Sequence, residues 1–276
     1  MFGSKLNYES RFFIVRDPPH GVARHYDLSG INSIDVDYQN AANTTNLLGY
    51  QKGLTTIGGP TSQTVSLSRY LVAIDNHDVF LDFTGASHIV TGSFNYDNNA
   101  SYGFESGYLT SYSVNCAVGS IPKVNTSLVV YDELRSGVNA SGGGAQTIYI
   151  PSQGSMTATC DNTTTNRVIG FDYSLEVGRK PYYTIGSETP VEVKYIPPIK
   201  YTASVQLEVD DVFLESGYSF LTTGKEEKTV SFSIKSRDQT VTMQSLTIPK
   251  ASLVSEQLSA SADGSVRLTL NYVGHS

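Results

Sequence analysis

Strict alternation of apolar and polar residues recurs along this chain and limits what it can fold into. Thr64–Ser68, Thr229–Ile234 and Ser265–Leu270 each place apolar residues at every second position. Successive side chains of a β-strand point to opposite faces, so this period predicts strands with one buried face. No long 3.6-residue period is present, and we therefore predict an all-β fold. Further strands are expected at residues 31–38, 79–83, 88–95, 108–117, 125–131, 155–160, 167–177, 202–209, 241–249 and 252–261.

One short segment departs from the alternation. Val130–Ser136 is followed by Gly137, a residue that commonly ends helices. We therefore expect one short helix there, flanking the strands.

The sequence also contains an internal repeat. Val36–Tyr38 resembles Phe171–Tyr173, and Leu109–Val114 resembles Leu253–Leu258. The offset between matched residues rises along the chain, from 135 (172 − 37) to 144 (253 − 109), as small insertions in the second copy would produce. Three further matches fall between these in the same order: Leu48-Gly49 with Ile185-Gly186, Thr64–Leu67 with Thr202–Val205, and Val90–Phe94 with Val230–Ile234.

The repeat predicts two tandem domains. We expect the first at residues 31–135 and the second at residues 154–276. Residues 136–153 contain Ser141–Gly144, a composition typical of a flexible Gly/Ser-rich linker. Residues 1–30 have no counterpart in the repeat and are predicted to form an N-terminal arm.

Each copy has a long segment after its first strand. Gln39–Gln63 and Gly178–Lys200 are too long for ordinary hairpin loops. Loops of this length usually carry function, so we expect both to reach a neighbouring subunit. Proline fixes the backbone angle φ, and the second segment is stiffened by Pro181, Pro190, Pro197 and Pro198.

Composition narrows the function classes. Charged residues make up only 16% of the chain and the net charge is −7 with no basic run. Affinity for nucleic acid depends mainly on Lys and Arg, so we expect no specific grip on DNA, although an acidic wall could surround DNA and let it slide. A charge-poor surface favours contact with neighbouring copies. Cys116 and Cys160 do not make a disulfide framework and are expected to be reduced.

Targeting signals are not evident. Met1–Gly21 is polar and lacks an apolar signal core, and no stretch approaches the roughly 18 apolar residues of a membrane span. We therefore expect synthesis in a cytoplasm and no membrane association.

No catalytic motif is found. The five histidines lie outside metal-binding spacings, and no Gly-x-Ser-x-Gly motif occurs. We expect neither an enzyme nor a cofactor. The densest acidic cluster, Glu208, Asp210 and Asp211 with Glu215, lacks the spacing of a calcium loop, so it is interpreted as an exposed strand end or as part of a channel wall.

Two segments of the second copy resemble a known family. Arg167–Val177 leads into Arg179–Ser187, which has an Arg-x-Pro sequence followed by a hydrophobic-Gly pair. Pro249–Glu256 precedes a turn and a last strand over Leu268–Tyr272. These segments resemble the bacteriophage tail tube (major tail) proteins over most of the second copy. The first copy departs from the pattern, because Asn46–Gly49 contains neither Arg nor Pro.

The resemblance implies two tandem tail-tube-like β-sandwich or barrel domains, each with a short flanking helix, and long loops between rings. Such subunits form rings, either trimers with pseudo-sixfold symmetry or hexamers, which stack into the tube that conducts the genome into the host cell. The implied partners are the tape measure, tail initiator and tail terminator proteins, with DNA passing through unbound. The implied location is the virion tail.

The implied contacts fall on particular residues. We expect the acidic residues Glu208, Asp210 and Asp211 to face the lumen, where they would repel phosphates. Inter-subunit contacts are expected at Leu48, Gly49, Arg179, Pro181, Ile185, Gly186, Pro197 and Pro198.

Two alternatives remain open at this point. The chain could be another virion component, such as a tail terminator, a head decoration protein or a fibre-base protein. It could also be a two-domain β-sandwich adhesin, although the absence of tryptophan and of a disulfide pattern weighs against an immunoglobulin-like domain.

Overall fold

Antiparallel strands account for all the regular structure that we describe. The computed structural model describes residues 10–17, 24–39, 42–45, 54–57, 62–72, 89–96, 101–138, 147–149, 156–160, 163–209, 226–260 and 266–276. Within these residues there are 17 strands and no helix. The prediction of an all-β fold is confirmed.

One strand order occurs twice along the chain. In the first half the order is β3-β6-β9-β8-β7-β1-β2, and in the second half it is β13-β14-β17-β16-β15-β11-β12. The first set comprises β1 (Ser10–Asp17), β2 (Arg24–Leu28), β3 (Ile31–Gln39), β6 (Ser62–Tyr70), β7 (Ile89–Tyr96), β8 (Ser101–Ala117) and β9 (Lys123–Val130). The second comprises β11 (Met156–Cys160), β12 (Thr163–Thr165), β13 (Val168–Tyr182), β14 (Glu192–Val209), β15 (Lys228–Lys235), β16 (Thr242–Ala260) and β17 (Val266–His275).

The two halves are joined edge to edge. β8 pairs with β13 from Ser111–Glu176 to Ala117–Gly170, so a single 15-stranded sheet runs through both halves. The division into domains at 31–135 and 154–276 therefore stays a prediction. Three short strands complete the fold: β10 (Arg135–Ser136) pairs with β8, and β4 (Ala42–Thr45) pairs with β5 (Leu54–Ile57) in a separate hairpin.

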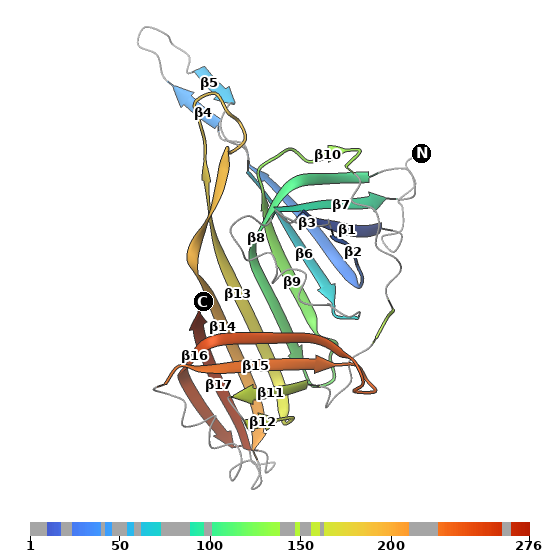
Figure 1. Ribbon diagram of the computed structural model, residues 1–276, viewed down its shortest axis with the longest axis vertical. Helices are drawn as coiled ribbons and strands as arrows, with labels where there is room; N and C mark the ends of the chain where they lie inside the picture. Colours follow the sequence, from blue (N-terminus) through green and yellow to red (C-terminus); the bar gives the residue numbers. More distant parts are fainter. Residues whose placement is uncertain are drawn as a thin grey trace.

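Each half has two layers that share one long strand. β15 and β11 cross over β13, β14 and β17 (Figure 1). β16 belongs to both layers, because it pairs with β15 up to Ala251 and with β17 from Ala251 onward. β8 does the same around Gly107, which pairs with both Val90 of β7 and Val130 of β9. Strands that bend from one sheet layer to the next are the usual corners of orthogonal sheet packing.

The register of the two copies also agrees. Gly107 pairs with Val130 in the first copy, and Ala251 pairs with Gly274 in the second. Both residues of the second pair lie 144 positions after their equivalents in the first (251 − 107 and 274 − 130). Both long strands carry a bulge at equivalent places, between Leu109 and Ser111 in β8 and between Leu253 and Ser255 in β16. Bulges increase local bending, which is what a strand shared by two layers requires.

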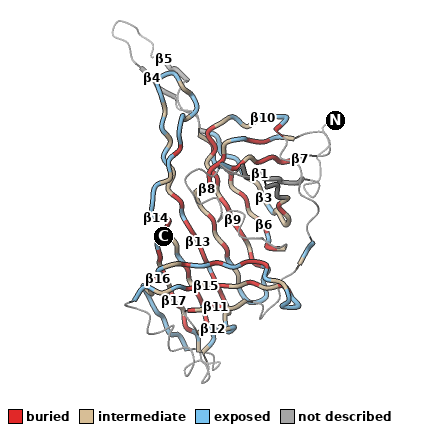
Figure 2. Tube along the Cα trace, viewed as in Figure 1, coloured by how far each residue is buried: buried red, intermediate tan, exposed pale blue. Residues whose placement is uncertain are grey.

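The core follows the alternation in the sequence. In β9, Val124, Thr126, Leu128 and Val130 are buried while the residues between them are half-buried. The buried positions of the long strands line the space between the layers (Figure 2). Full burial of one aliphatic side chain of this kind contributes roughly 1.5–3 kcal/mol. Three tyrosines are among the largest fully buried side chains: Tyr112, Tyr173 and Tyr272.

The short helix expected at Val130–Ser136 is absent, and this prediction was wrong. Val130 is the last residue of β9, and Arg135 and Ser136 pair with Gly103 and Tyr102 of β8. Strand pairing at Arg135 and Ser136, and the hydrogen bond that the Tyr131 N–H donates to the Ser106 oxygen, use backbone groups that a helix would otherwise pair.

The predicted N-terminal arm, the strand predicted at 79–83 and the predicted linker can be compared with the described strands. Within residues 1–30, predicted as an arm, β1 pairs with β7 over eight positions and β2 pairs with β1. They take the places in the strand order that β11 and β12 take in the second half. The strand expected at 79–83 and the centre of the predicted linker, 139–146, lie outside the described residues.

Candidate assembly surfaces

The first half ends in an edge strand whose core-side residues are uncovered. Among the described strands, β3 pairs with β6 alone. Val36 and Tyr38 lie opposite Val65 and Gln63, both of which are buried. Val36 and Tyr38 themselves remain 41% and 47% exposed. They point to the core side of the sheet at its end, where the next strand would cover them.

The second half ends in a similar edge. Beyond Ala251, β16 pairs with β17 and with no other described strand. Leu258 lies opposite the buried Leu268 and is nevertheless 65% exposed. Val254, at the bulge of the same strand, is also exposed. A free strand edge with large apolar side chains is a ready template for pairing with another chain.

The seam between the halves shows what such an edge becomes when it is covered. Val114 of β8 lies opposite Tyr173 of β13, and both side chains are almost completely buried. On the opposite face of the same seam, Asp172 lies opposite Asn115. The seam is therefore apolar on its core side and polar on its outer side.

The outer face of the long sheet is mainly polar, although Tyr70, Val129 and Val273 also lie on it. Cross-strand hydrogen bonds connect Ser174 Oγ with Thr202 Oγ1 at 2.6 Å, and Asn271 Nδ2 donates to Ser255 Oγ at 2.7 Å. Acidic side chains outnumber basic ones on this face: Asp35, Asp37, Asp172, Glu176 and Glu208, against Lys123, Lys200 and Arg267. The face is thus a hydroxyl-rich and mildly acidic surface.

A long hairpin projects from this sheet. β13 and β14 stay paired out to Tyr182 and Glu192, beyond the ends of the neighbouring strands (Figure 1). The pairing is irregular between Glu176 and Gly178, where β14 carries extra residues that include Pro197 and Pro198, both exposed. The β4–β5 hairpin of the first half also projects toward the same end of the molecule (Figure 1).

Arg179 holds the base of this hairpin against the first half. Its Nε donates a hydrogen bond to the backbone oxygen of Leu109 at 3.2 Å. The guanidinium lies over the rings of Tyr108 and Tyr195, 5.7 and 5.9 Å from their centroids. Arginine stacks on aromatic faces while still donating from its edge, which suits this place. Burial lowers the pKa of the Arg179 guanidinium, and the nearby tyrosines oppose that shift.

The tyrosines at the same place are shifted in the other direction. Burial, as the main cause, and the nearby Tyr183 and Tyr108 raise the pKa of Tyr131 to about 12, although Arg179 acts in the opposite direction. Burial also raises the pKa of Tyr108, although Arg179 acts against it. The hairpin base is therefore a poorly solvated aromatic cluster organised around one cation.

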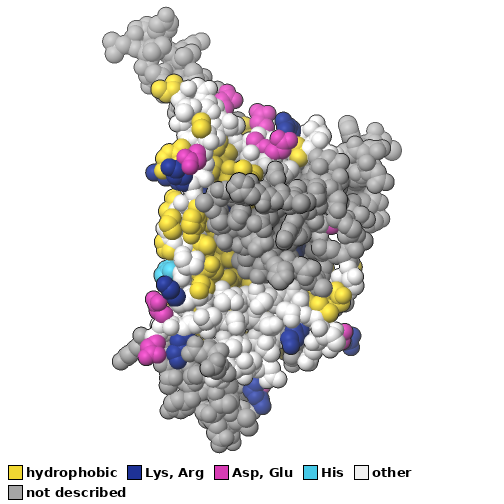
Figure 3. Space-filling view, in the orientation of Figure 1, with side chains coloured by type: hydrophobic (Ala, Val, Ile, Leu, Met, Phe, Trp, Pro, Cys, Tyr) yellow, Lys and Arg dark blue, Asp and Glu magenta, His cyan; other side chains and the backbone are white. Residues whose placement is uncertain are grey.

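The tip of the hairpin presents apolar side chains to solvent. Ile185 is fully exposed, and Val191 and Tyr182 are exposed as well. Gly186 adopts a φ of +87°, a conformation that favours glycine in the turn. Further hydrophobic side chains gather along the left margin of the molecule, mainly over the lower part of this hairpin (Figure 3). An exposed apolar patch on a projecting element marks an interaction surface.

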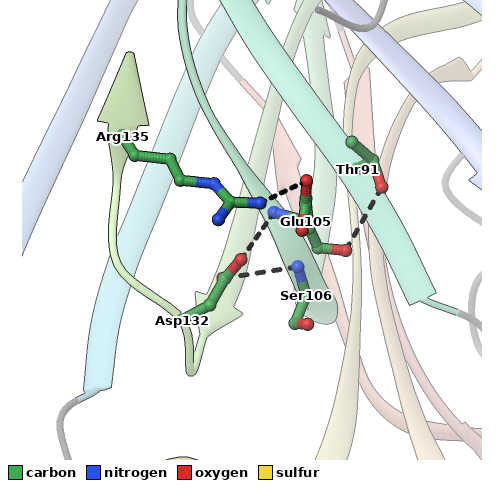
Figure 4. Close-up of polar contacts among 5 residues, drawn as sticks. All are labelled: Thr91, Glu105, Ser106, Asp132 and Arg135. Atoms are coloured by element: carbon green, nitrogen blue, oxygen red, sulfur yellow. Dashed lines mark hydrogen bonds and ion pairs between the residues drawn. The ribbon is translucent and has the colours of Figure 1, made fainter. Parts of the chain in front are cut away.

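Asp132 fixes the loop beside the hairpin base. Its carboxylate accepts hydrogen bonds from the backbone N–H groups of Glu105, at 2.7 Å, and Ser106, at 3.3 Å (Figure 4). Arg135 forms an ion pair with Glu105 at 2.5 Å, and Thr91 Oγ1 donates to the Glu105 carbonyl oxygen at 3.2 Å. These contacts connect β7, β8 and the segment after β9 next to the bend of β8.

The predicted contact residues are thus spread over several places. Arg179 and Pro181 lie in the projecting part of β13, Ile185 and Gly186 at its tip, and Pro197 and Pro198 at the irregular part of β14. Glu208 is exposed on the polar face opposite Arg267. Leu48, Gly49, Asp210 and Asp211 lie outside the described residues.

The edge residues Val36, Tyr38 and Leu258 were not among the predicted contacts. A signal for them existed in the repeat, because Leu253–Leu258 matches Leu109–Val114 and Val36–Tyr38 matches Phe171–Tyr173. The strand register shifts the second match by two residues, so that Val36 corresponds to Tyr173. One member of each match lies in the covered seam, and the other lies at a free edge.

In the described ranges, no group of three or more His, Cys, Asp and Glu residues is placed to hold a metal ion. The same part of the chain contains no helix that is long and apolar enough to cross a bilayer. Cys116 is a half-buried free thiol, and Cys160 is buried.

No protein-family model matches the chain, and no curated protein matches it significantly.

Proposed function

We propose that this chain is a structural virion protein that assembles with copies of itself into rings, and that the rings stack into a phage tail tube through which the genome passes. The observation that carries the proposal is a pair of sheet edges on one molecule, β3 and the second half of β16, that no other described strand covers. Two different complementary surfaces on one chain give head-to-tail contacts, which close into rings or extend as filaments.

The polar face of the sheet supports the role of a conduit. If the edges pair around a ring, this face is the one without a covering layer, and it would line the channel. Its hydroxyl-rich and mildly acidic character offers DNA few cations to bind. Phosphates would pass such a wall with little retention.

The projecting hairpin supports stacking between rings. Its apolar tip around Ile185 lies away from the body of the sheet and is exposed. Burial of this tip against a neighbouring ring would remove apolar surface from water. In this proposal, a tape measure protein, a tail initiator and a tail terminator set where the tube begins and ends, and the ring is a trimer with pseudo-sixfold symmetry or a hexamer.

Electron microscopy of the purified protein tests the proposal, together with size-exclusion chromatography over a range of concentrations. Tubes with a regular axial repeat and an open centre are expected. Single rings that never stack would favour a tail terminator or another capping component of the virion. A monomer at every concentration tested would contradict self-assembly altogether.

A further inference from the structure

The internal seam of the sheet provides a template for the contact between molecules. We infer that the second half of β16 in one chain pairs with β3 of a second copy, antiparallel and in the register of the β8–β13 seam. This inference rests on the proposed function and specifies the contact on which it depends. It follows from which strands are equivalent in the two halves.

β16 is the equivalent of β8. Both strands change partners at corresponding residues, Gly107 and Ala251, and both carry the same bulge. The pairing of each with its next strand matches residue by residue at an offset of 144, from Gly107 with Val130 to Asn115 with Lys123. Val114 of β8 therefore corresponds to Leu258 of β16 (258 − 114 = 144).

β3 is the equivalent of β13. Val65 of β6 pairs with Leu128, and Ala203 of β14 pairs with Tyr272, which is the equivalent of Leu128. Across the other edge, Val65 pairs with Val36 while Ala203 pairs with Tyr173. Val36 of β3 therefore corresponds to Tyr173 of β13.

The two equivalences together fix the contact. Within the chain, Val114 lies opposite Tyr173. Between chains, the same geometry places Leu258 of one copy opposite Val36 of the next. On the polar face, Asp35 comes to lie opposite Ser259, as Asp172 lies opposite Asn115 inside the chain.

The exposure of these residues agrees with a missing neighbour. Val114 and Tyr173 are 0% and 2% exposed, whereas their equivalents Leu258 and Val36 are 65% and 41% exposed. All four lie on the core side of the sheet. A second strand at each free edge would bury Leu258 and Val36 in the way that the seam buries Val114 and Tyr173.

The occupant of each edge is a second copy of the chain. β3 and β16 lie at opposite ends of the row β3-β6-β9-β8-β13-β14-β17-β16. Strands in a sheet are spaced about 4.8 Å apart, so the two edges are separated by roughly 34 Å along the sheet. They do not meet in one molecule, but each presents the partner that the other lacks.

Paired cysteines test the register directly. Val36→Cys and Leu258→Cys are combined in a Cys116→Ser background, in which the remaining Cys160 is fully buried. After assembly and mild oxidation, or treatment with a short bis-maleimide, the double variant should form a ladder of covalent oligomers. A mixture of the two single variants should form covalent dimers and nothing larger. A control pair, Val36→Cys with Gln257→Cys, places one thiol on each face and should not link.

Lysine substitutions provide a second test. Leu258→Lys and Val36→Lys should raise the concentration needed for assembly by about tenfold or more, because charge on a free edge opposes pairing. Val118→Lys is the matched control, since Val118 is 51% exposed in the turn after β8. Far-UV circular dichroism and the unfolding midpoint should be unchanged in all three variants.

The outcomes separate the two proposals. Regular assemblies that form without the Val36–Leu258 link, or that link through Gln257 instead, overturn the inferred β16–β3 contact between chains. They leave the tube proposal standing. Wild-type protein that stays monomeric overturns both.

Discussion

Gly107 and Ala251 occupy the same place in the two halves of the chain. Each is the residue at which a long strand pairs with two different strands, Gly107 with Val90 and Val130, and Ala251 with Lys228 and Gly274. They are the points where β8 and β16 turn from one layer of the fold to the other. The residue types differ because the surroundings differ: a side chain at 107 would meet Phe104, which is fully buried.

Gly107→Ala should destabilise the fold. An added Cβ would lie 2.5 Å from Phe104 Cε2 and 3.1 Å from the backbone oxygen of Val90. Overpacking of this kind costs about 1–3 kcal/mol, measured as the free energy of unfolding in urea. Gly170→Ala is the control, because the nearest atoms there belong to the movable side chain of Gln206. Equal effects at both positions would show that the bend at Gly107 tolerates a side chain.

Arg179→Lys should loosen the base of the hairpin. Lysine keeps the charge but loses the planar group that lies over Tyr108 and Tyr195 while donating to the Leu109 carbonyl oxygen. We expect a loss of about 1–2 kcal/mol in unfolding free energy. Lys180→Met, next in the sequence and exposed, should change it by less than about 0.5 kcal/mol. Full stability in Arg179→Lys would mean that charge alone holds the hairpin.

Asp132→Ala should weaken the contacts that hold the segment after β9 against β8. The substitution leaves the N–H groups of Glu105 and Ser106 without their carboxylate acceptor. The expected cost is about 1–2 kcal/mol in the free energy of unfolding. The neighbouring Glu133 is exposed, so Glu133→Ala serves as the control. Amide hydrogen exchange at Glu105 and Ser106 should accelerate only in the Asp132 variant.

Stability should fall in strong alkali because of Tyr131. Its pKa is about 12 in the folded protein, against about 10 for an unfolded chain. The folded state therefore holds this proton more tightly, so the contribution is complete below pH 10 and is lost as the pH rises toward 12. Tyr131→Phe should show a smaller loss between pH 10 and 12 in urea unfolding. Tyr182→Phe, at an exposed tyrosine, should behave as the wild type does.

Ile185→Asp should separate ring formation from stacking. The side chain is fully exposed at the hairpin tip, so the monomer should keep its unfolding midpoint. Under the tube proposal, a charge there would prevent burial of the tip against the next ring and leave single rings in electron micrographs. Glu188→Asp, also exposed in the turn, should still give tubes. Tubes of normal length from Ile185→Asp would exclude the tip from the contact.

Sequence patterns identified most strands because alternation is a local property. Thr64–Ser68, Thr229–Ile234 and most of Ser265–Leu270 lie in β6, β15 and β17. The short helix was predicted wrongly because the seven residues of Val130–Ser136 are too few to distinguish periods, and the pairing of Arg135 with Gly103 of β8 decides their structure.

The candidate surfaces were harder to predict because exposure depends on strand order. Val36 and Tyr173 have similar sequence surroundings, yet Tyr173 is covered by β8 and Val36 is not. Likewise, the hydrogen bond from Arg179 to Leu109 joins residues 70 positions apart. The role predicted for Arg179 between subunits therefore stays a prediction, whereas its contact with Leu109 lies within one chain.

The unbroken β8–β13 seam has a geometric consequence. Because hydrogen bonds lock the two halves together, the angle between them is a built-in property of each molecule rather than a joint that neighbours could adjust. An annulus made from such chains can change its circumference only by whole molecules, and therefore by two repeats at a time. The diameter of the channel would then be set by the width of one two-repeat chain, and it could change only in steps of two repeats.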